Sequence, residues 1–246
     1  SRSDPNNYRG IMMLEVAYKI HANIIHARLQ PIIESLDHEQ QCGFRSARGC
    51  FDGIFTIKQL INKRREHGQE TWMLFIDLVK AFDKVPRCAK KTFSRDENDP
   101  AEAAKDETLG MLWRVMLKFG VPTKIVRLLI NMHKMVHVKF DVDGVTKTIE
   151  SIVGVKQGDL LGPDLFTFYI AAIMITWRSE HQYETCVVRS RPDFKMTGRR
   201  HTTGSAADEL AIIDSEYADD TGLPFTSRKD VEEQSPLLCA HFKRWG

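Results

Sequence analysis

The stretch "DSEYADDTGL", residues 214–223, places two adjacent acids, Asp219 and Asp220, behind a tyrosine and an alanine. An apolar segment precedes it and a glycine follows soon after the acids, so we expect a hairpin with the acids at its tip. Neighbouring carboxylates repel each other, and a bound cation would offset that repulsion. The alternative is a solvated turn, and the pair taken alone favours this alternative.

A third acid ends another apolar segment. The stretch "TWMLFID", residues 71–77, is too short for an independent helix and suits a strand buried on both faces, which delivers Asp77 at its end. A fold that brings Asp77 to Asp219 and Asp220 would need a cation among them. Mg²⁺ prefers oxygen ligands, and two such ions stabilise the attacking and leaving oxygens of phosphoryl transfer. A site for two Mg²⁺ ions at these three acids, with Mn²⁺ as the alternative ion, is therefore one interpretation, and a solvated turn remains the other for the acid pair.

Composition sets only broad bounds. The 246 residues are 42% hydrophobic, enough for one large domain or two small ones, and the net charge of +2 neither demands nor excludes a nucleic-acid partner. The longest apolar run, residues 165–177, is shorter than the roughly 20 residues that span a bilayer, so we expect a buried helix and no membrane partner. The polar start at Ser1 lacks the apolar core of a signal peptide and suggests a fragment of a longer protein.

The cysteines and histidines form no metal-binding pattern in the sequence. The five cysteines include no CxxC pair, and we interpret them as reduced thiols of an intracellular protein, located in the nucleus, the cytoplasm or both. The histidines have no cysteine or acid at ligand spacing, and we assign them no chemistry.

Periodicity predicts alternating helical and extended segments. Helices are expected at residues 11–36, where Pro31 either kinks the helix or starts a second one, and at 51–66 with Gly68 as cap. Further elements are helices at 109–119, from 123 onward and at 163–177, a hairpin around Asp143-Gly144, a basic loop at 178–207, and a disordered insertion at 88–108.

Five ordered stretches carry a family resemblance. The stretches "FIDLVKAFDKV" (75–85), "GVKQGDLLGPDLFTFYI" (154–170) and "YADD" (217–220) resemble three palm motifs of reverse transcriptases. Upstream, "NNYRGIMMLEVAYKI" (6–20) and "QQCGFRSARGCFDGI" (40–54) resemble two fingers motifs of non-LTR, LINE-type retrotransposons. The matches cover nearly the whole chain outside the insertion and the basic loop.

The resemblance implies an α+β right-hand polymerase fold with fingers, an antiparallel palm sheet and no thumb. The implied domains are fingers (1–70), a palm strand with Asp77 (71–83), a fingers/palm connection with the insertion (84–150), and a palm with the YADD hairpin, truncated at the C-terminus (151–246). The implied function is RNA-directed DNA polymerase, which uses an RNA template, a DNA primer and deoxynucleoside triphosphates. Its oligomeric state is left open.

In the family, the acids matching Asp77 and Asp219 bind both catalytic metals, and the acid matching Asp220 has a weaker role. Phe82 resembles the aromatic residue beneath the incoming sugar, and Ala218 stands where RNA polymerases of the same palm architecture typically carry glycine. The alternative for Phe82 is an ordinary core aromatic. Tyr217 is expected beside the primer end, with plain packing as its alternative.

Arg9 and Arg45 resemble fingers arginines that approach the triphosphate or the template backbone, and Arg48 is a further candidate. Their alternative is a solvated surface. Gln157 and Gly158 resemble the turn next to the nucleotide, where the absence of a side chain allows close approach. Gly158 alternatively only shapes the turn.

Three features depart from the family pattern. Asp159 and Gly162 replace the usual cysteine and serine, and Asp159 adds a charge expected to weaken triphosphate binding. The insertion at 88–108 falls where relatives have none. The end "AHFKRWG" (240–246) resembles the start of the next palm motif, whose lysine and following thumb would lie beyond Gly246. The alternative function is therefore a catalytically inactive retroelement relic that at most binds nucleic acid.

Overall fold

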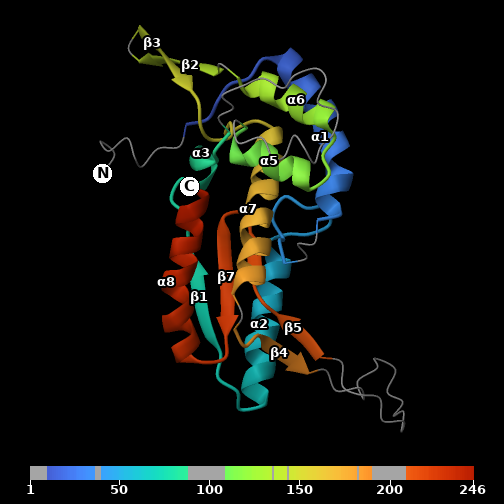
Figure 1. Ribbon diagram of the computed structural model, residues 1–246, viewed down its shortest axis with the longest axis vertical. Coiled ribbons are helices and arrows are strands. Elements are labelled where there is room, and N and C mark those ends of the chain that lie inside the picture. Colours follow the sequence, from blue (N-terminus) through green and yellow to red (C-terminus); the bar gives the residue numbers. More distant parts are fainter. Residues whose placement is uncertain are drawn as a thin grey trace. The chain divides into compact units, whose positions relative to one another are not determined.

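The structure is a computed structural model that describes residues 10–36, 40–87, 109–134, 136–142, 144–181, 183–189 and 209–246. Arg9, the predicted insertion at 88–108 and residues 190–207 of the predicted basic loop lie outside these residues. The helices are α1 (Val16–Glu34), α2 (Cys50–Glu66), α3 (Ala81–Lys84), α5 (Met111–Lys118), α6 (Thr123–His133), α7 (Leu161–Glu180) and α8 (Arg228–Trp245) (Figure 1). The strands are β1 (Trp72–Ile76), β2 (Val136–Val142), β3 (Val145–Ser151), β4 (Cys186–Arg189), β5 (Glu209–Ile212), β6 (Ser215–Tyr217) and β7 (Asp220–Phe225).

Helices and antiparallel sheets together confirm a mixed fold of the expected α+β kind. The chain forms two compact units that alternate along the sequence. Unit 1 comprises Ser1–His38, Val79–Thr176 and Phe242–Gly246, and unit 2 comprises Glu39–Leu78 and Trp177–His241. The division into fingers and palm is a functional one and stays a prediction.

Unit 2 contains a three-stranded sheet in the order β1-β7-β6, with both pairs antiparallel. Strand β7 pairs with β1 from Thr221 to Phe225, but with β6 only as far as Gly222. At Pro224 the strand therefore has a neighbour on one side only. Proline lacks an N–H and is tolerated at such edge positions, which explains its presence inside β7.

Strand β1 differs from its prediction. It was expected to be buried on both faces, but Trp72 is 39% exposed and Phe75 is 69% exposed. Strand β1 is an edge strand of this sheet, so it lacks the cover that a central strand has. A continuous apolar run indicates a strand, but it does not indicate how much of each face is covered.

The predicted basic loop at 178–207 is also wrong in part. Helix α7 continues to Glu180, and β4 pairs with β5 from Cys186↔Ile212 to Arg189↔Glu209. Cys186 and Ile212 are buried together with Leu60 of α2 in a small core. Arginines dominate the composition of residues 178–207, so the short apolar strand β4 gives no clear signal in the sequence.

In unit 1, α1 is a single helix that contains Pro31, so no second helix begins there. The predicted hairpin is confirmed, with β2 and β3 paired from Val136↔Ser151 to Val142↔Val145. Helix α7 begins at Leu161, where the Asp159 carboxylate accepts a hydrogen bond from the Leu161 N–H at 3.2 Å.

The structure also bears on membrane-spanning helices and on the cysteines. Across the described residues, no helix has the length and apolar character needed to cross a bilayer. The cysteines Cys42, Cys50, Cys186 and Cys239 are free thiols.

Candidate active site

The turn between β6 and β7 carries the paired acids. Tyr217 pairs with Asp220, so Ala218 and Asp219 form a two-residue hairpin loop. Ala218 has a φ of 58°, whereas Asp219 does not have a positive φ. Positive φ at the first central residue alone is typical of a type II′ turn, which suits the twist of a hairpin. The predicted hairpin tip is confirmed, with Asp219 in the loop and Asp220 opening β7.

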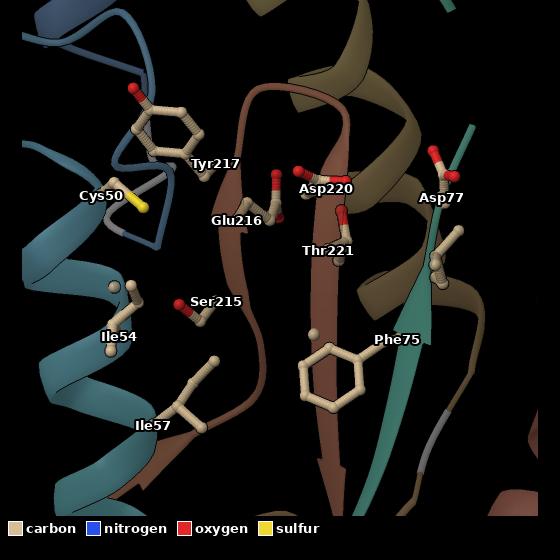
Figure 2. Close-up of a pocket in the computed structure, with 13 residues that line it drawn as sticks. Cys50, Ile54, Ile57, Phe75, Asp77, Ser215, Glu216, Tyr217, Asp220 and Thr221 are labelled. Carbon is tan, nitrogen blue, oxygen red and sulfur yellow. The ribbon is translucent and has the colours of Figure 1, made fainter. Parts of the chain in front are cut away.

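Asp77 reaches this turn through the sheet. The pairing of β1 with β7 ends at Ile76↔Thr221, so Asp220 occupies the next position across from Asp77. Residues opposite each other in an antiparallel pair have Cα atoms about 4.5–5.5 Å apart and side chains on the same face. Figure 2 shows both side chains at the same end of the two strands. The fold therefore brings the strand end and the turn together.

The three acids are open to solvent. Asp77 and Asp220 are exposed and Asp219 is half-buried. Their carboxylates are not among the described groups of three whose ligand atoms all lie within 4.8 Å of one another. Mg²⁺ commonly binds through one or two carboxylates plus substrate phosphates rather than in an all-protein cage. Accessible carboxylates from neighbouring strands fit that mode of binding.

A pocket of about 360 Å³ lies beside the acids within unit 2. Residues of α2, β1, β6 and β7, together with Asp77, line this pocket (Figure 2). Ile54, Ile57 and Phe75 form an apolar part, while Asp77 and Asp220 lie at the other end. The acids thus border a concave surface with both polar and apolar walls.

Gln41 holds the turn in place, and it was not singled out from the sequence. This buried side chain is 1% exposed. Its Oε1 accepts hydrogen bonds from the N–H groups of Gly43 at 2.7 Å and Ala218 at 2.9 Å. Its Nε2 donates to the Ala218 carbonyl at 3.3 Å and to the Glu216 carboxylate at 3.4 Å. One amide therefore binds both backbone groups of the first loop residue, and no local pattern could have indicated a partner so distant in sequence.

Gly43 allows this close approach. A Cβ atom at residue 43 would lie 2.5 Å from the backbone nitrogen of Ala218 and 2.9 Å from Oε1 of Gln41. Real Cβ atoms do not approach backbone nitrogen so closely. Glycine is therefore required where this segment crosses the turn.

A buried ion pair supports the start of β6. Arg178 at the end of α7 donates to both carboxylate oxygens of Asp214, each at 2.9 Å, and to Glu216 at 3.3 Å. Both acids have fully buried side chains. Because two parallel N–H···O bonds fix orientation as well as distance, Arg178 anchors the strand that leads into the turn.

The other predicted residues of unit 2 lie near the same segment. Arg45 is half-buried, Arg48 is exposed, and Tyr217 is 43% exposed next to the turn. Burial raises the pKa of the Cys42 thiol, while the nearby Arg48 charge lowers it. Arg48 therefore lies close to Cys42, and its predicted role toward a nucleotide stays a prediction, as does that of Arg45.

Phe82, Gln157 and Gly158 come together in unit 1. The Phe82 ring stacks on Phe166 with centroids 4.4 Å apart, and the Phe82 carbonyl accepts a hydrogen bond from Val155 at 2.7 Å. Gln157 donates from Nε2 to Asp83 at 3.0 Å, next to Phe82 in sequence. Gly158 has a φ of +94°, which favours glycine. The structure groups these residues, while their contacts with a nucleotide stay predicted.

Asp159 is not a surface charge. It is 5% exposed, accepts a hydrogen bond from the Tyr18 hydroxyl at 2.5 Å, and accepts the Leu161 N–H described above. Burial, together with the Asp159 hydrogen bond, raises the pKa of Tyr18. Within unit 1 this acid therefore caps α7 and binds α1.

Comparison with protein families matches residues 2–91 to the family described as reverse transcriptase (RNA-dependent DNA polymerase). The transposon TX1 uncharacterized 149 kDa protein of Xenopus laevis is 34% identical over 79 residues, which are 32% of this chain and 6% of that protein. These two matches confirm the resemblance to a reverse transcriptase domain of a non-LTR retrotransposon.

Solved structures similar to this chain include two telomerases. Telomerase from Candida tropicalis, truncated from its C-terminal domain, has a TM-score of 0.45 and 11% identity over 92% of this chain and 40% of that one. Telomerase from Candida albicans, in complex with a fragment of telomeric RNA, has a TM-score of 0.46 and 11% identity over 92% of this chain and 33% of that one.

Proposed function

We propose that this reverse transcriptase domain catalyses RNA-directed DNA synthesis, adding deoxynucleotides to the 3′-hydroxyl of a primer paired with an RNA template. The observation that carries the proposal is the position of Asp77 across from Asp220, with Asp219 in the adjoining two-residue turn. The family match over residues 2–91 supports the same reaction.

The three acids are proposed as the metal ligands. Asp77 and Asp219 would hold two divalent ions, Mg²⁺ or Mn²⁺, and Asp220 would support them. Their donor atoms are carboxylate oxygens of two exposed residues and one half-buried residue, which suits these ions and leaves access for phosphate oxygens. Bound ions would lower the pKa of the primer 3′-hydroxyl and neutralise the leaving pyrophosphate.

The remaining residues are proposed to position the substrates. Phe82 would pack beneath the incoming sugar and exclude a 2′-hydroxyl, and Gln157 and Gly158 would contact the nucleotide. Arg9 and Arg45 would bind the triphosphate or the template through their guanidinium groups. The half-buried Phe82 ring stacks on Phe166, a contact that would limit its rotation and so favour such a selection.

The proposal is tested by deoxynucleotide incorporation on an RNA template with a DNA primer and Mg²⁺. The variants Asp219→Ala and Asp77→Asn should each lose more than about 100-fold in rate, because each removes a group that stabilises developing charge. Glu150→Gln, which removes an exposed carboxylate of the β2–β3 hairpin, is the matched control and should retain full activity.

Three results would contradict the proposal. Incorporation that survives Asp219→Ala would remove the proposed mechanism. Equal use of ribonucleotides would favour RNA synthesis. Binding of the template and primer without any incorporation would support the inactive relic.

A further inference from the structure

Three potential ligands meet where the end of α7 approaches α8 within unit 2. Each of Glu180, His181 and His241 offers a ligand atom, and these atoms all lie within 4.8 Å of one another. Glu180 and His181 are consecutive, whereas His241 comes from a separate helix. No part of the polymerase proposal uses these side chains.

The orientation of His181 is fixed by Trp177. The two rings stack with centroids 3.8 Å apart and an interplanar angle of 21°. Nδ1 of His181 lies 3.3 Å from the Trp177 carbonyl oxygen. Because a carbonyl oxygen only accepts, Nδ1 carries the hydrogen and Nε2 carries the lone pair. Metal-binding histidines are typically held in this way, with the second nitrogen donating to a carbonyl or carboxylate.

His241 completes the cluster from a buried position. It is 1% exposed. Its ring lies edge-on to the rings of Trp177 and His181, with ring centroids 5.6 Å and 5.9 Å apart, respectively. Its Nδ1 lies 3.6 Å from the Glu180 carboxylate, which is longer than a good hydrogen bond. The Glu180 side chain is 45% exposed. The cluster thus has a buried imidazole on one side and solvent access on the other.

We propose that Glu180, His181 and His241 form a binding site for a divalent transition-metal ion, with Zn²⁺ as the reference ion. Two imidazole nitrogens and one carboxylate oxygen suit zinc, cobalt or nickel, whereas Mg²⁺ prefers oxygen ligands. Water would complete the coordination from the exposed side. The ion would tie the end of α7 to α8 and stabilise unit 2 against unfolding.

The site is tested with Zn²⁺ and Co²⁺ on the whole chain. Zn²⁺ should raise the melting temperature at concentrations far below those at which Mg²⁺ does, and Co²⁺ should give visible absorption bands that Zn²⁺ displaces. His181→Ala and Glu180→Gln should each weaken Zn²⁺ binding by at least about tenfold. Removing a group that only supports a metal ligand already costs about that much in metal affinity, and these variants remove a ligand itself. These two positions are not fully buried, so both variants are expected to fold.

Two matched control variants distinguish metal binding at this site from metal binding by other acidic or histidine side chains. Asp219→Ala removes an acid of the candidate active site, and His137→Ala removes an exposed histidine of β2. Both should bind Zn²⁺ and Co²⁺ as the unchanged chain does. Unaltered affinity in His181→Ala and Glu180→Gln, or no rise in melting temperature at millimolar Zn²⁺, would overturn the assignment.

Discussion

Replacing Gln41 with alanine should destabilise the turn that carries the candidate catalytic acids. The substitution removes an acceptor that serves two N–H groups, those of Gly43 and Ala218, and a donor that serves the Ala218 carbonyl and Glu216. Both N–H groups are buried in the folded chain.

The size of the effect follows from those unpaired groups. Each buried N–H left without an acceptor costs about 1–3 kcal/mol, so the loss of an acceptor for two of them in Gln41→Ala should lower the free energy of unfolding by about 2–6 kcal/mol. Gln41→Glu keeps an acceptor for both N–H groups but brings a second carboxylate next to Glu216, about where Nε2 now lies. Its destabilisation should therefore shrink as the pH falls and the carboxylates are protonated.

Urea unfolding followed by circular dichroism measures both effects, and the primer-extension assay measures the effect on the turn. Gln40→Ala is the matched control, because only the backbone carbonyl of Gln40 has described hydrogen bonds. It should change the free energy of unfolding by less than about 0.5 kcal/mol. Equal stability of Gln41→Ala and Gln40→Ala would refute the assignment of Gln41 to the turn.

Three further predictions follow from single positions. Gly43→Ala should destabilise the chain by about 1–3 kcal/mol in urea unfolding, because its Cβ would overlap the Ala218 backbone, whereas Gly49→Ala, with its nearest atom at 3.8 Å, should cost far less. Burial, together with the Lys156 charge, lowers the pKa of His133 from 6.5 to about 3. The unfolded chain therefore binds more protons below pH 6.5, so the free energy of unfolding is greatest above that pH and falls as the pH drops toward 3. His133→Asn should reduce this acid dependence in urea titrations at several pH values, and His137→Asn should leave it unchanged. Phe82→Val should increase ribonucleotide incorporation relative to deoxynucleotide incorporation by roughly tenfold or more, since removing the ring alters the discrimination between the two sugars by about 1–3 kcal/mol. An unchanged ratio of the two incorporation rates would exclude Phe82 from sugar selection.

Elements with a local signal could be predicted from the sequence. The helix at Cys50–Glu66 ends where Gly68 has a φ of +66°, and the β2–β3 hairpin turns at Gly144. Both depend on backbone preferences of a few neighbouring residues, which any window of sequence contains. The motifs around Asp77 and Asp219 likewise carried the resemblance to reverse transcriptases, which the family match over residues 2–91 supports, while the role of the acids stays a prediction.

Tertiary structure alone decided which of these segments meet. Three features join residues distant in sequence: the β1–β7 pairing that ends at Ile76↔Thr221, next to Asp77 and Asp220, the amide of Gln41 at the turn, and the approach of His241 to His181. Periodicity shows which side of a strand or helix is apolar, but it does not specify the partner. Strand register and side-chain packing choose that partner, since each contact becomes favourable only once the others have formed.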